Sequence, residues 1–406
     1  MFKVLTAVAL TLSLLAGATA EAGYSCLRIF RGAQRPPIEL TFGPEFSFTN
    51  DELIAAGNKL KRPESPENAW KLEELEFLYK EKCSRGECRL SYGRDKHGRT
   101  VKVVFEDGWY LTLSLDMCAL EVQTKPTTLE DFKRHMPRLK EVFALMKAVG
   151  LEPHTRVGGG HIHMGMNAIQ DRLLLRNFFV DYANFPELSF GALGNHLYNS
   201  PSLAAQKPEQ RRALDRVLEN YDTKPSMTSK DFARQVQREV YTSTFKYQHA
   251  PDHYQAIRVE RVLFPAGSAT VEVRAFRPQE SPEHFLLQLE LLQDRINFLA
   301  DNAAPVRYAS PSKFTFEPQE IVDGFHEYVA GMGASWERYK VLLPAELREL
   351  QPSGNIVERQ NENATEPTLP IGRLSPEQIK ASSPPATKPS VFDSFFRMLC
   401  PTCWIQ

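Results

Sequence analysis

Two histidines alternate with apolar residues in the stretch Val157-Gly-Gly-Gly-His-Ile-His-Met-Gly165. In an extended strand successive side chains point to opposite faces, so His161 and His163 project to one side and the apolar pair to the other. The preceding glycines allow a ligand to approach the backbone closely. The stretch therefore predicts a binding or catalytic site, with two solvated histidines on a polar strand face as the alternative.

Four other stretches show the same alternation of polar and apolar residues. Their polar positions hold Glu45, Glu121, Arg258 with Glu260, and Glu272 with Arg274. An antiparallel sheet with one face against helices and one face open produces such a pattern. Gathered carboxylates repel one another unless cations neutralise them. Mg²⁺ binds carboxylate oxygens and phosphates together, and arginines hold phosphate or carboxylate groups. The set predicts metal-assisted chemistry on an anionic substrate, with cross-strand salt bridges as the alternative.

Period-two and helical patterns predict the elements that position these residues. Strands are expected at 38–48, 100–105, 109–115, 120–126, 254–263 and 269–276, besides the histidine stretch. Helices are expected at 52–60, 69–82, 129–149, 167–183, 282–300 and 318–328, with a shorter pair up to 350 and a mostly helical middle over 186–241. Asp107-Gly108 predicts a hairpin turn, and Pro137 predicts a break near Met136.

Residues 1–20 have the features of a secretory signal peptide: Lys3, an apolar run over 4–15, and the small-residue site Ala18-Thr-Ala20. A buried N-terminal helix is the alternative. The run is short for a membrane span, and no other segment is long enough, so an exported, periplasmic or secreted, soluble protein is expected. Removing Lys3 changes the net charge from −1 to −2, a balance that predicts no nucleic-acid partner.

The remaining chain divides by composition. Residues 21–350 form the expected catalytic domain, with substrate-facing insertions in its helical middle. Residues 351–390, rich in Pro, Ser, Thr, Asn and Glu, are expected to be a disordered linker. Residues 391–406 form an apolar tip that docks on its own domain, on a membrane surface as a peripheral contact, or on a partner.

The six cysteines suit an exported chain. Cys83 and Cys88 bracket a turn-like sequence and predict a local disulfide. Cys26 and Cys118 are a candidate second pair, although other pairings are open. Cys400 and Cys403 are expected to form a tail disulfide or to remain free thiols.

Four of these motifs together resemble the amidoligase family of glutamine synthetase-like carboxylate–amine ligases. They are Phe42-Gly-Pro-Glu-Phe-Ser47, Leu120-Glu-Val-Gln-Thr-Lys-Pro126, Gly159-Gly-His-Ile-His163 and Ala269-Thr-Val-Glu-Val-Arg-Ala-Phe-Arg277. The family shows an fG-x-E-x-E strand, an E-x-x-T/S-P strand, a gG-x-H-x-H strand and a T-x-E-x-R strand. Their order and spacing match across about 38–278, over half of the chain.

The resemblance implies an α+β fold in which a curved antiparallel sheet has helices on one face and binds ATP with Mg²⁺ or Mn²⁺ on the other. The implied metal ligands are Glu45, Glu121 and Glu272. The residues implied to contact the nucleotide are Gly159, Gly160, His161 and Arg274, and those implied in catalysis are Arg274, Arg258 and His163. Ser47 stands where the family usually has a second glutamate.

The implied reaction is phosphorylation of a carboxylate by ATP, followed by attack of an amine on the acyl phosphate. Amino-acid, peptide or cell-wall carboxylates and small amines are the expected substrates. A metal-dependent hydrolase using His161 and His163 with a carboxylate is an alternative. An exported, non-catalytic peptide-binding homologue is another, because Ser47 removes one charge and ATP is scarce outside the cell.

Overall fold

Strand β1 (Thr41–Thr49) packs one row of phenylalanines against helices in this computed structural model. The structure describes residues 37–60, 66–95, 98–116, 119–153, 160–194, 207–241, 255–301 and 304–355. Phe42, Phe46 and Phe48 are at most 1% exposed, whereas Glu45 on the other parity is partly exposed. The alternation expected for this strand is confirmed.

Ten strands form one sheet in the order β2-β3-β4-β5-β1-β8-β10-β9, and the short strands β6 and β7 also pair with β1. The other strands are β2 (Cys88–Asp95), β3 (Gly98–Phe105), β4 (Tyr110–Asp116), β5 (Ala119–Thr124), β6 (Thr127–Thr128), β7 (Glu152–Pro153), β8 (Gly160–Gly165), β9 (Ile257–Arg258) and β10 (Thr270–Phe276). All pairs are antiparallel. The mixed α+β class is therefore confirmed, and the hairpin at Gly108 has the expected positive φ of 76°.

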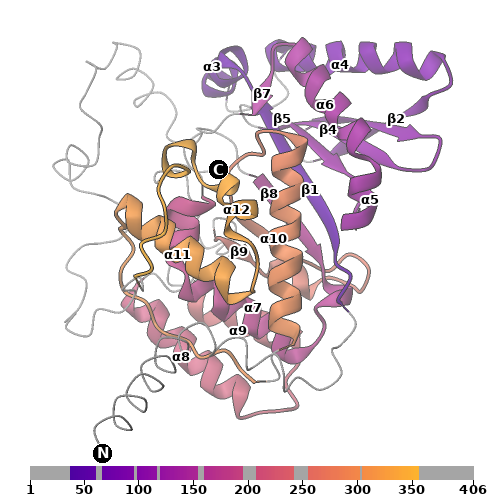
Figure 1. The fold of residues 1–406 in the computed structure, drawn as a ribbon. Helices are drawn as coiled ribbons and strands as arrows, with labels where there is room; N and C mark the ends of the chain where they lie inside the picture. The colour runs from indigo at the N-terminus through magenta and orange to yellow at the C-terminus, as the bar shows by residue number, and fades with distance from the viewer. Residues whose placement is uncertain are drawn as a thin grey trace, which may run out of the picture. The chain divides into compact units, whose positions relative to one another are not determined.

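Three helices cover the apolar face of β1: α5 (Leu129–Arg134), α6 (Met136–Ala148) and α10 (Pro282–Ala300). The ring of Phe46 lies 4.8 Å from that of Phe285 on α10 and 5.5 Å from that of Phe143 on α6. Figure 1 shows α10 running alongside β1. This aromatic layer fixes which face of the sheet is left for polar residues.

The expected break near Met136 is confirmed. Helix α5 ends at Arg134, and α6 begins at Met136 with Pro137 in its first turn, where a missing N–H costs no helical hydrogen bond. Thr128 caps α5 by accepting a hydrogen bond from the backbone N–H of Asp131.

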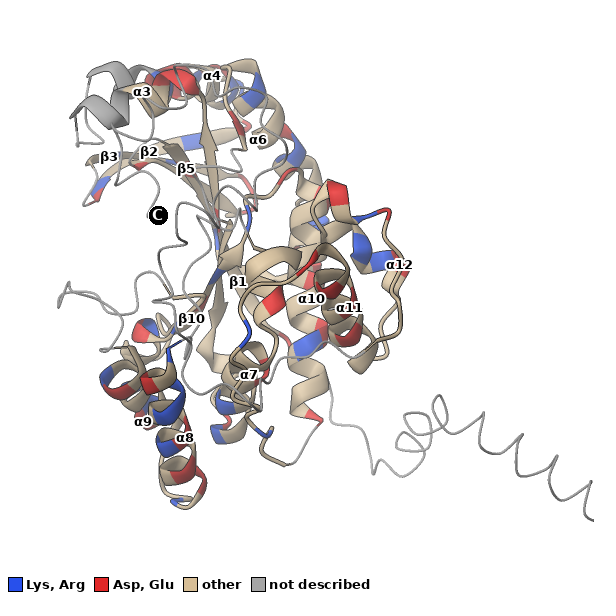
Figure 2. Cartoon of the chain, turned by 90° about the vertical axis from the view of Figure 1, so that its left-hand side faces the viewer, with Lys and Arg blue, Asp and Glu red and all other residues tan. Residues whose placement is uncertain are grey.

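The remaining helices follow the expected order. They are α3 (Asp51–Leu60), α4 (Pro66–Ser84), α7 (Arg172–Asn184), α8 (Pro208–Asp222), α9 (Ser229–Gln235), α11 (Pro318–Gly331) and α12 (Trp336–Tyr339), with the π-helical turns η2 (Leu188–Ala192) and η3 (Val236–Tyr241), and the short 3₁₀ turns η1 (Met166–Ala168), η4 (Glu260–Leu263), η5 (Lys340–Leu342) and η6 (Ala345–Leu347). Figure 2 shows cationic and acidic residues interspersed along α8 and α9. Such mixed surfaces agree with the near-zero net charge.

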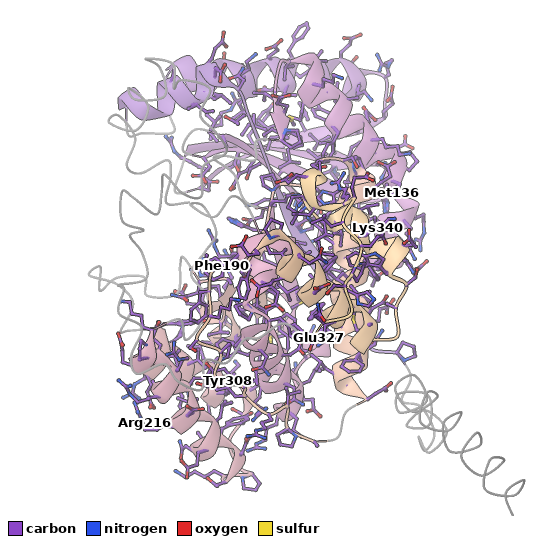
Figure 3. The ribbon with its side chains drawn as sticks, turned by 60° about the vertical axis from the view of Figure 1, so that its left-hand side comes forward. Met136, Phe190, Arg216, Tyr308, Glu327 and Lys340 are labelled. Carbon is purple, nitrogen blue, oxygen red and sulfur yellow. A yellow bond between two sulfur atoms is a disulfide. The ribbon has the colours of Figure 1, made fainter. Side chains whose placement is uncertain are left out.

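Two asparagines on α7 bind the extended segment that follows α10. Asn177 accepts a hydrogen bond from Val306 N and donates one to Ala304 O, and Asn184 makes the same two kinds of contact with Ala309 and Arg307. Figure 3 labels Tyr308 within this segment. The side-chain amides thus satisfy backbone N–H and C=O groups of this segment, as a neighbouring strand would in a sheet.

Two sequence predictions are wrong in detail. The strand expected at 254–263 is limited to β9 and is followed by the turn η4, because Val259 leaves the extended region (ψ 0°) and η4 packs against α9. The helix expected from Asn167 begins at Arg172, where Asp171 caps it by accepting hydrogen bonds from the N–H groups of Leu173 and Leu174. Tertiary packing overrides β-propensity in the first case, and the cap sets the boundary in the second.

The disulfide predicted between Cys83 and Cys88 is present. The described residues from Ile38 onward form one compact unit. The predicted signal peptide, the second cysteine pair, the tail cysteines, most of the linker and the apolar tip lie outside the described residues. Within the described residues, no helix has the length and apolarity needed to cross a bilayer.

Replacing Phe285 by alanine tests the aromatic layer. The buried ring contacts those of Phe46 and Phe132, so its loss should reduce the free energy of unfolding by about 3–5 kcal/mol. Phe77, which is 67% exposed on α4, provides the control: Phe77→Ala should change it by no more than about 0.5 kcal/mol. Urea denaturation of both variants gives the comparison, and equal losses would contradict the packing described here.

A second test uses His284, which is buried at the start of α10. Burial lowers its pKa to about 4, and the charges of Arg277 and Arg348 act in the same direction against that of Glu280. The folded state therefore binds fewer protons than the unfolded state between pH 4 and the usual pKa of 6.5. Stability should fall by about 2 kcal/mol from pH 7 to pH 5 through this group. Urea denaturation of His284→Gln should show a correspondingly smaller pH dependence, and an unchanged one would contradict the assignment.

Candidate metal and anion site

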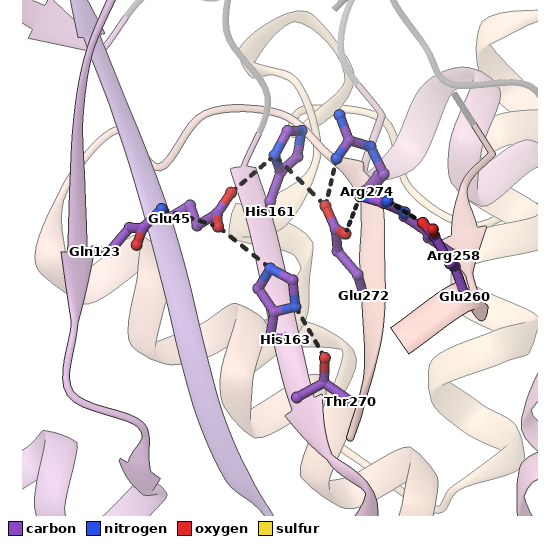
Figure 4. A network of polar contacts seen from close by, with 9 residues as sticks. All are labelled: Glu45, Gln123, His161, His163, Arg258, Glu260, Thr270, Glu272 and Arg274. Carbon is purple, nitrogen blue, oxygen red and sulfur yellow. Dashed lines mark hydrogen bonds and ion pairs between the residues drawn. The ribbon is translucent and has the colours of Figure 1, made fainter. Parts of the chain in front are cut away.

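Strand β8 lies between β1 and β10, and its histidines face polar residues on both neighbours. Glu45 of β1 pairs directly with His161, and Glu272 of β10 pairs with His163. Since side chains of directly opposed residues project to the same face, the register gathers four titratable groups on the face opposite the aromatic layer. Figure 4 shows them converging between the three strands.

The carboxylate of Glu45 bridges the two imidazoles. Its Oε2 lies 3.4 Å from Nδ1 of His161, and its Oε1 lies 3.3 Å from Nε2 of His163. Nδ1 of His161 is also 3.8 Å from Oε1 of Glu272. One ligand atom each from Glu45, His161 and Glu272 therefore lies within 4.8 Å of the other two. Such convergence of carboxylate oxygen and imidazole nitrogen suits a divalent cation.

His163 has a defined hydrogen-bonding pattern. Its Nδ1 lies 3.2 Å from the hydroxyl of Thr270, while its Nε2 faces Glu45. A carboxylate can only accept, so the neutral ring places its proton on Nε2 and leaves Nδ1 to accept from the threonine hydroxyl. The imidazole is thus oriented by two strands at once.

Two arginines neutralise Glu272, whose side chain is 2% exposed. Arg274 donates to its Oε1, and Arg258 lies 3.2 Å from its Oε2. Arg258 also pairs with Glu260. A guanidinium on each side of a buried carboxylate can exchange that partner for a bound anion when a cation takes over the carboxylate.

The carboxylates of this site are held ionised. Burial raises the pKa of Glu45, but hydrogen bonds from His161 and His163 outweigh it and hold that pKa well below its usual range. Burial likewise raises the pKa of Glu272, while the charge of Arg274 and the two histidines lower it to about 2. Both groups are therefore available as anionic ligands at neutral pH.

Some sequence-predicted site residues lie outside the three-residue cluster. Glu121 pairs with Ser47, so it is on the same face but two residues along β1 from the position of Glu45. Gln123 is instead the cross-strand partner of Glu45 and donates to its Oε1 at 3.2 Å. Gly159 lies outside the described residues.

Sequence reasoning missed Gln123, Thr270 and Gln279 as parts of the site. The first two share strand parity with Glu121 and Glu272, which was the available signal, but only the register shows what they touch. Gln279 is buried beside Gly160, and neither the nitrogen nor the oxygen of its side-chain amide has a hydrogen-bond partner among the described residues. No spacing rule connects it to β8.

The donor set fits a divalent metal. Two carboxylates and one imidazole match the oxygen and nitrogen ligands of Mg²⁺, Mn²⁺ or Zn²⁺. Arg274 has a buried Nε without a hydrogen-bond partner among the described residues, which leaves a donor for an anion. Comparison of the chain with models of known families finds no match, and comparison with curated proteins finds none either.

Gly160→Ala tests the close packing beside His161. A Cβ at this position would lie 2.5 Å from the carbonyl oxygen of Arg277 and 2.6 Å from Nε2 of Gln279. The overpacking should cost about 1–3 kcal/mol of unfolding free energy. At Gly43 on the neighbouring strand the added Cβ meets Pro126 at 3.6 Å, so Gly43→Ala should leave stability unchanged or slightly raised. Thermal and urea unfolding of the pair would refute this packing if both variants behaved alike.

Proposed function

We propose that this protein is an ATP-dependent carboxylate–amine ligase that uses Mg²⁺ or Mn²⁺. The observation that carries the proposal is the cluster of Glu45, His161 and Glu272 with Arg258 and Arg274 on Glu272. It combines ligands for a cation with donors for a phosphoryl group in one place. Transfer of a phosphoryl group depends mainly on such positioning and charge neutralisation.

The proposed reaction has two steps. A substrate carboxylate oxygen attacks the γ-phosphorus of ATP, forming an acyl phosphate and releasing ADP. An amine then attacks the acyl carbon, forming the amide and releasing phosphate and a proton. A bound divalent cation would supply charge neutralisation for the phosphate oxygens.

The chain's own residues have distinct roles in this scheme. Glu45, His161 and Glu272 would hold the cation. Arg258 and Arg274, released from Glu272, bind the transferred phosphoryl group. His163 accepts the proton of the attacking amine at Nδ1 through the hydroxyl of Thr270, which passes its own proton to that nitrogen and takes the proton of the amine.

The glutamine synthetase-like fold is part of the proposal. An antiparallel sheet with helices on one face and the charged cluster on the other supports it. Export is proposed as well, and the disulfide between Cys83 and Cys88 supports an oxidising compartment.

A metal-dependent hydrolase is the second candidate. The mixed set of one imidazole and two carboxylates resembles the ligands of catalytic zinc, which lowers the pKa of a bound water. Such an enzyme would carry zinc on purification and act without ATP. The two arginines are the feature that this alternative leaves without a role.

Calorimetry of ATP binding to the full chain, with and without Mg²⁺, tests the ligase. Binding should require Mg²⁺, and Glu272→Gln should weaken it at least about tenfold, because one charged ligand is worth about 1.5–3 kcal/mol. Glu260→Gln is the control, because it removes a 42% exposed carboxylate that pairs with Arg258. This variant should bind ATP nearly as well as wild type. Circular dichroism checks that each variant is folded, and Glu45→Gln provides a second test of the cluster.

Two results would overturn the proposal. One is no heat of binding at millimolar ATP with Mg²⁺ present. The other is a stoichiometric zinc content together with ATP-independent hydrolysis of peptides, which would establish the hydrolase instead.

A further inference from the structure

A cavity of about 370 Å³ adjoins the cluster on the same face of the sheet. Its floor includes Glu45 and His163, and its walls come from β3 and β4 on one side and from η4 and the turn before β10 on the other. In the sheet order, β3 and β10 are five strand spacings apart, about 24 Å on a flat sheet. Residues from both line one small cavity, so this face of the sheet is concave here.

A continuous polar row crosses the floor of this cavity. Lys102 pairs with Thr112, Thr112 with Gln123, and Gln123 with Glu45. Each step is one strand spacing, so Lys102 and Glu45 are about 14 Å apart along a flat sheet and closer across a concave one. The row therefore links the cluster to a cation at the far side of the cavity.

Among the described residues that line the cavity, Lys102 and Arg261 are the strongly basic ones and Glu45 carries the one carboxylate. The ammonium of Lys102 lies 3.5 Å from the centre of the Tyr110 ring. Neither cation forms an ion pair with a carboxylate of the described chain. Two such cations on opposite walls favour a ligand that brings its own negative charge.

The lining does not suit a nucleotide base. Besides the imidazole of His163, Tyr110 supplies the one aromatic ring among the described lining residues, and the face of this ring toward Lys102 is occupied by the ammonium group. Threonine, serine, asparagine and glutamine side chains make up much of the remainder. These groups bind peptide amides and carboxylates rather than an apolar or stacked ligand.

We propose that this cavity binds the carboxylate substrate, and that the substrate carries a second carboxylate, which lies between the walls and is contacted by Lys102 from one side and by Arg261 from the other. The inference rests on the proposed ligase function, which places the reacting carboxylate at the cluster. An extended peptide of two or three residues spans about 7–11 Å. The substrate class is therefore a short acidic peptide or a comparable compound with two separated carboxylates.

Straight-chain dicarboxylates from succinate to sebacate are the probes, compared with the monocarboxylates of equal chain length. Their binding to the full chain is measured by calorimetry with Mg²⁺ present, and ATP binding is measured on the same samples. Affinity should pass through a maximum at an intermediate length, and each monocarboxylate should bind at least about tenfold more weakly than the best dicarboxylate, since one charge-assisted contact is missing.

Variants of the two cations give the decisive comparison. Lys102→Gln and Arg261→Gln should each weaken the best dicarboxylate about tenfold or more and leave its monocarboxylate counterpart and ATP nearly unaffected. Lys102→Arg should retain most of the affinity. Lys147→Gln removes an exposed cation of α6, on the helix layer behind the sheet, and should change nothing.

The two proposals fail separately in this experiment. ATP binding without any dicarboxylate binding, or dicarboxylate binding that survives both glutamine variants, would overturn the distal carboxylate subsite and leave the ligase standing. Dicarboxylate binding that depends on Lys102, in a protein that does not bind ATP, would support the subsite and overturn the ligase. Loss of ATP binding in Lys102→Gln would assign the cavity to the nucleotide instead.

Discussion

The side chains of β8 alternate between the two faces of the sheet, and this alternation places both histidines of the site on the same face. Ile162 and Met164 are fully buried, while His161 and His163 project from the other face. A slip of one residue would exchange these faces and bury the imidazoles in the apolar layer. The core residues of β8 therefore keep its histidines on the polar face of the sheet as well as contributing to stability.

The neighbouring strands obey the same constraint. Glu45 is adjacent in sequence to Phe46, whose ring is enclosed by those of Phe143 and Phe285. Packing of that ring between α6 and α10 determines the direction in which the next side chain points. The helices thus orient the Glu45 carboxylate on the opposite face through the backbone of β1.

Charge compensation at Glu272 links structure to chemistry. A carboxylate this deeply buried is tolerated because Arg258 and Arg274 contact it and because two imidazoles lie nearby. Removing one partner from a buried ion pair costs far more than the intact pair contributes. A cation at Glu45, His161 and Glu272 would compete with the arginines for the same oxygens. In the proposed function, cation binding would therefore release the two guanidiniums from Glu272.

The position of Lys102 near Glu45 could not be predicted from the sequence, because it depends on pairing between distant strands. Lys102 belongs to the polar parity of β3, which by itself indicates only a solvated strand face. The register carries it through Thr112 and Gln123 to Glu45, across strands that are far apart in the chain. Lys102 and Glu45 line one cavity because this face of the sheet is concave.

The sequence by itself determined the local features of this protein. Periodicity predicted β1, β8 and β10 and the polar parity of each, Asp107-Gly108 predicted the hairpin, and Pro137 predicted the helix break. These follow from interactions between residues close in the chain, such as alternation, capping and turn geometry. The tertiary structure decided the rest. Strand order and register bring His161 together with Glu45 and Glu272 and place Glu121 outside this cluster. Packing against α9 accompanies the turn η4 where a longer strand was expected. Pairing between distant segments depends on how the whole core packs, which no local pattern encodes.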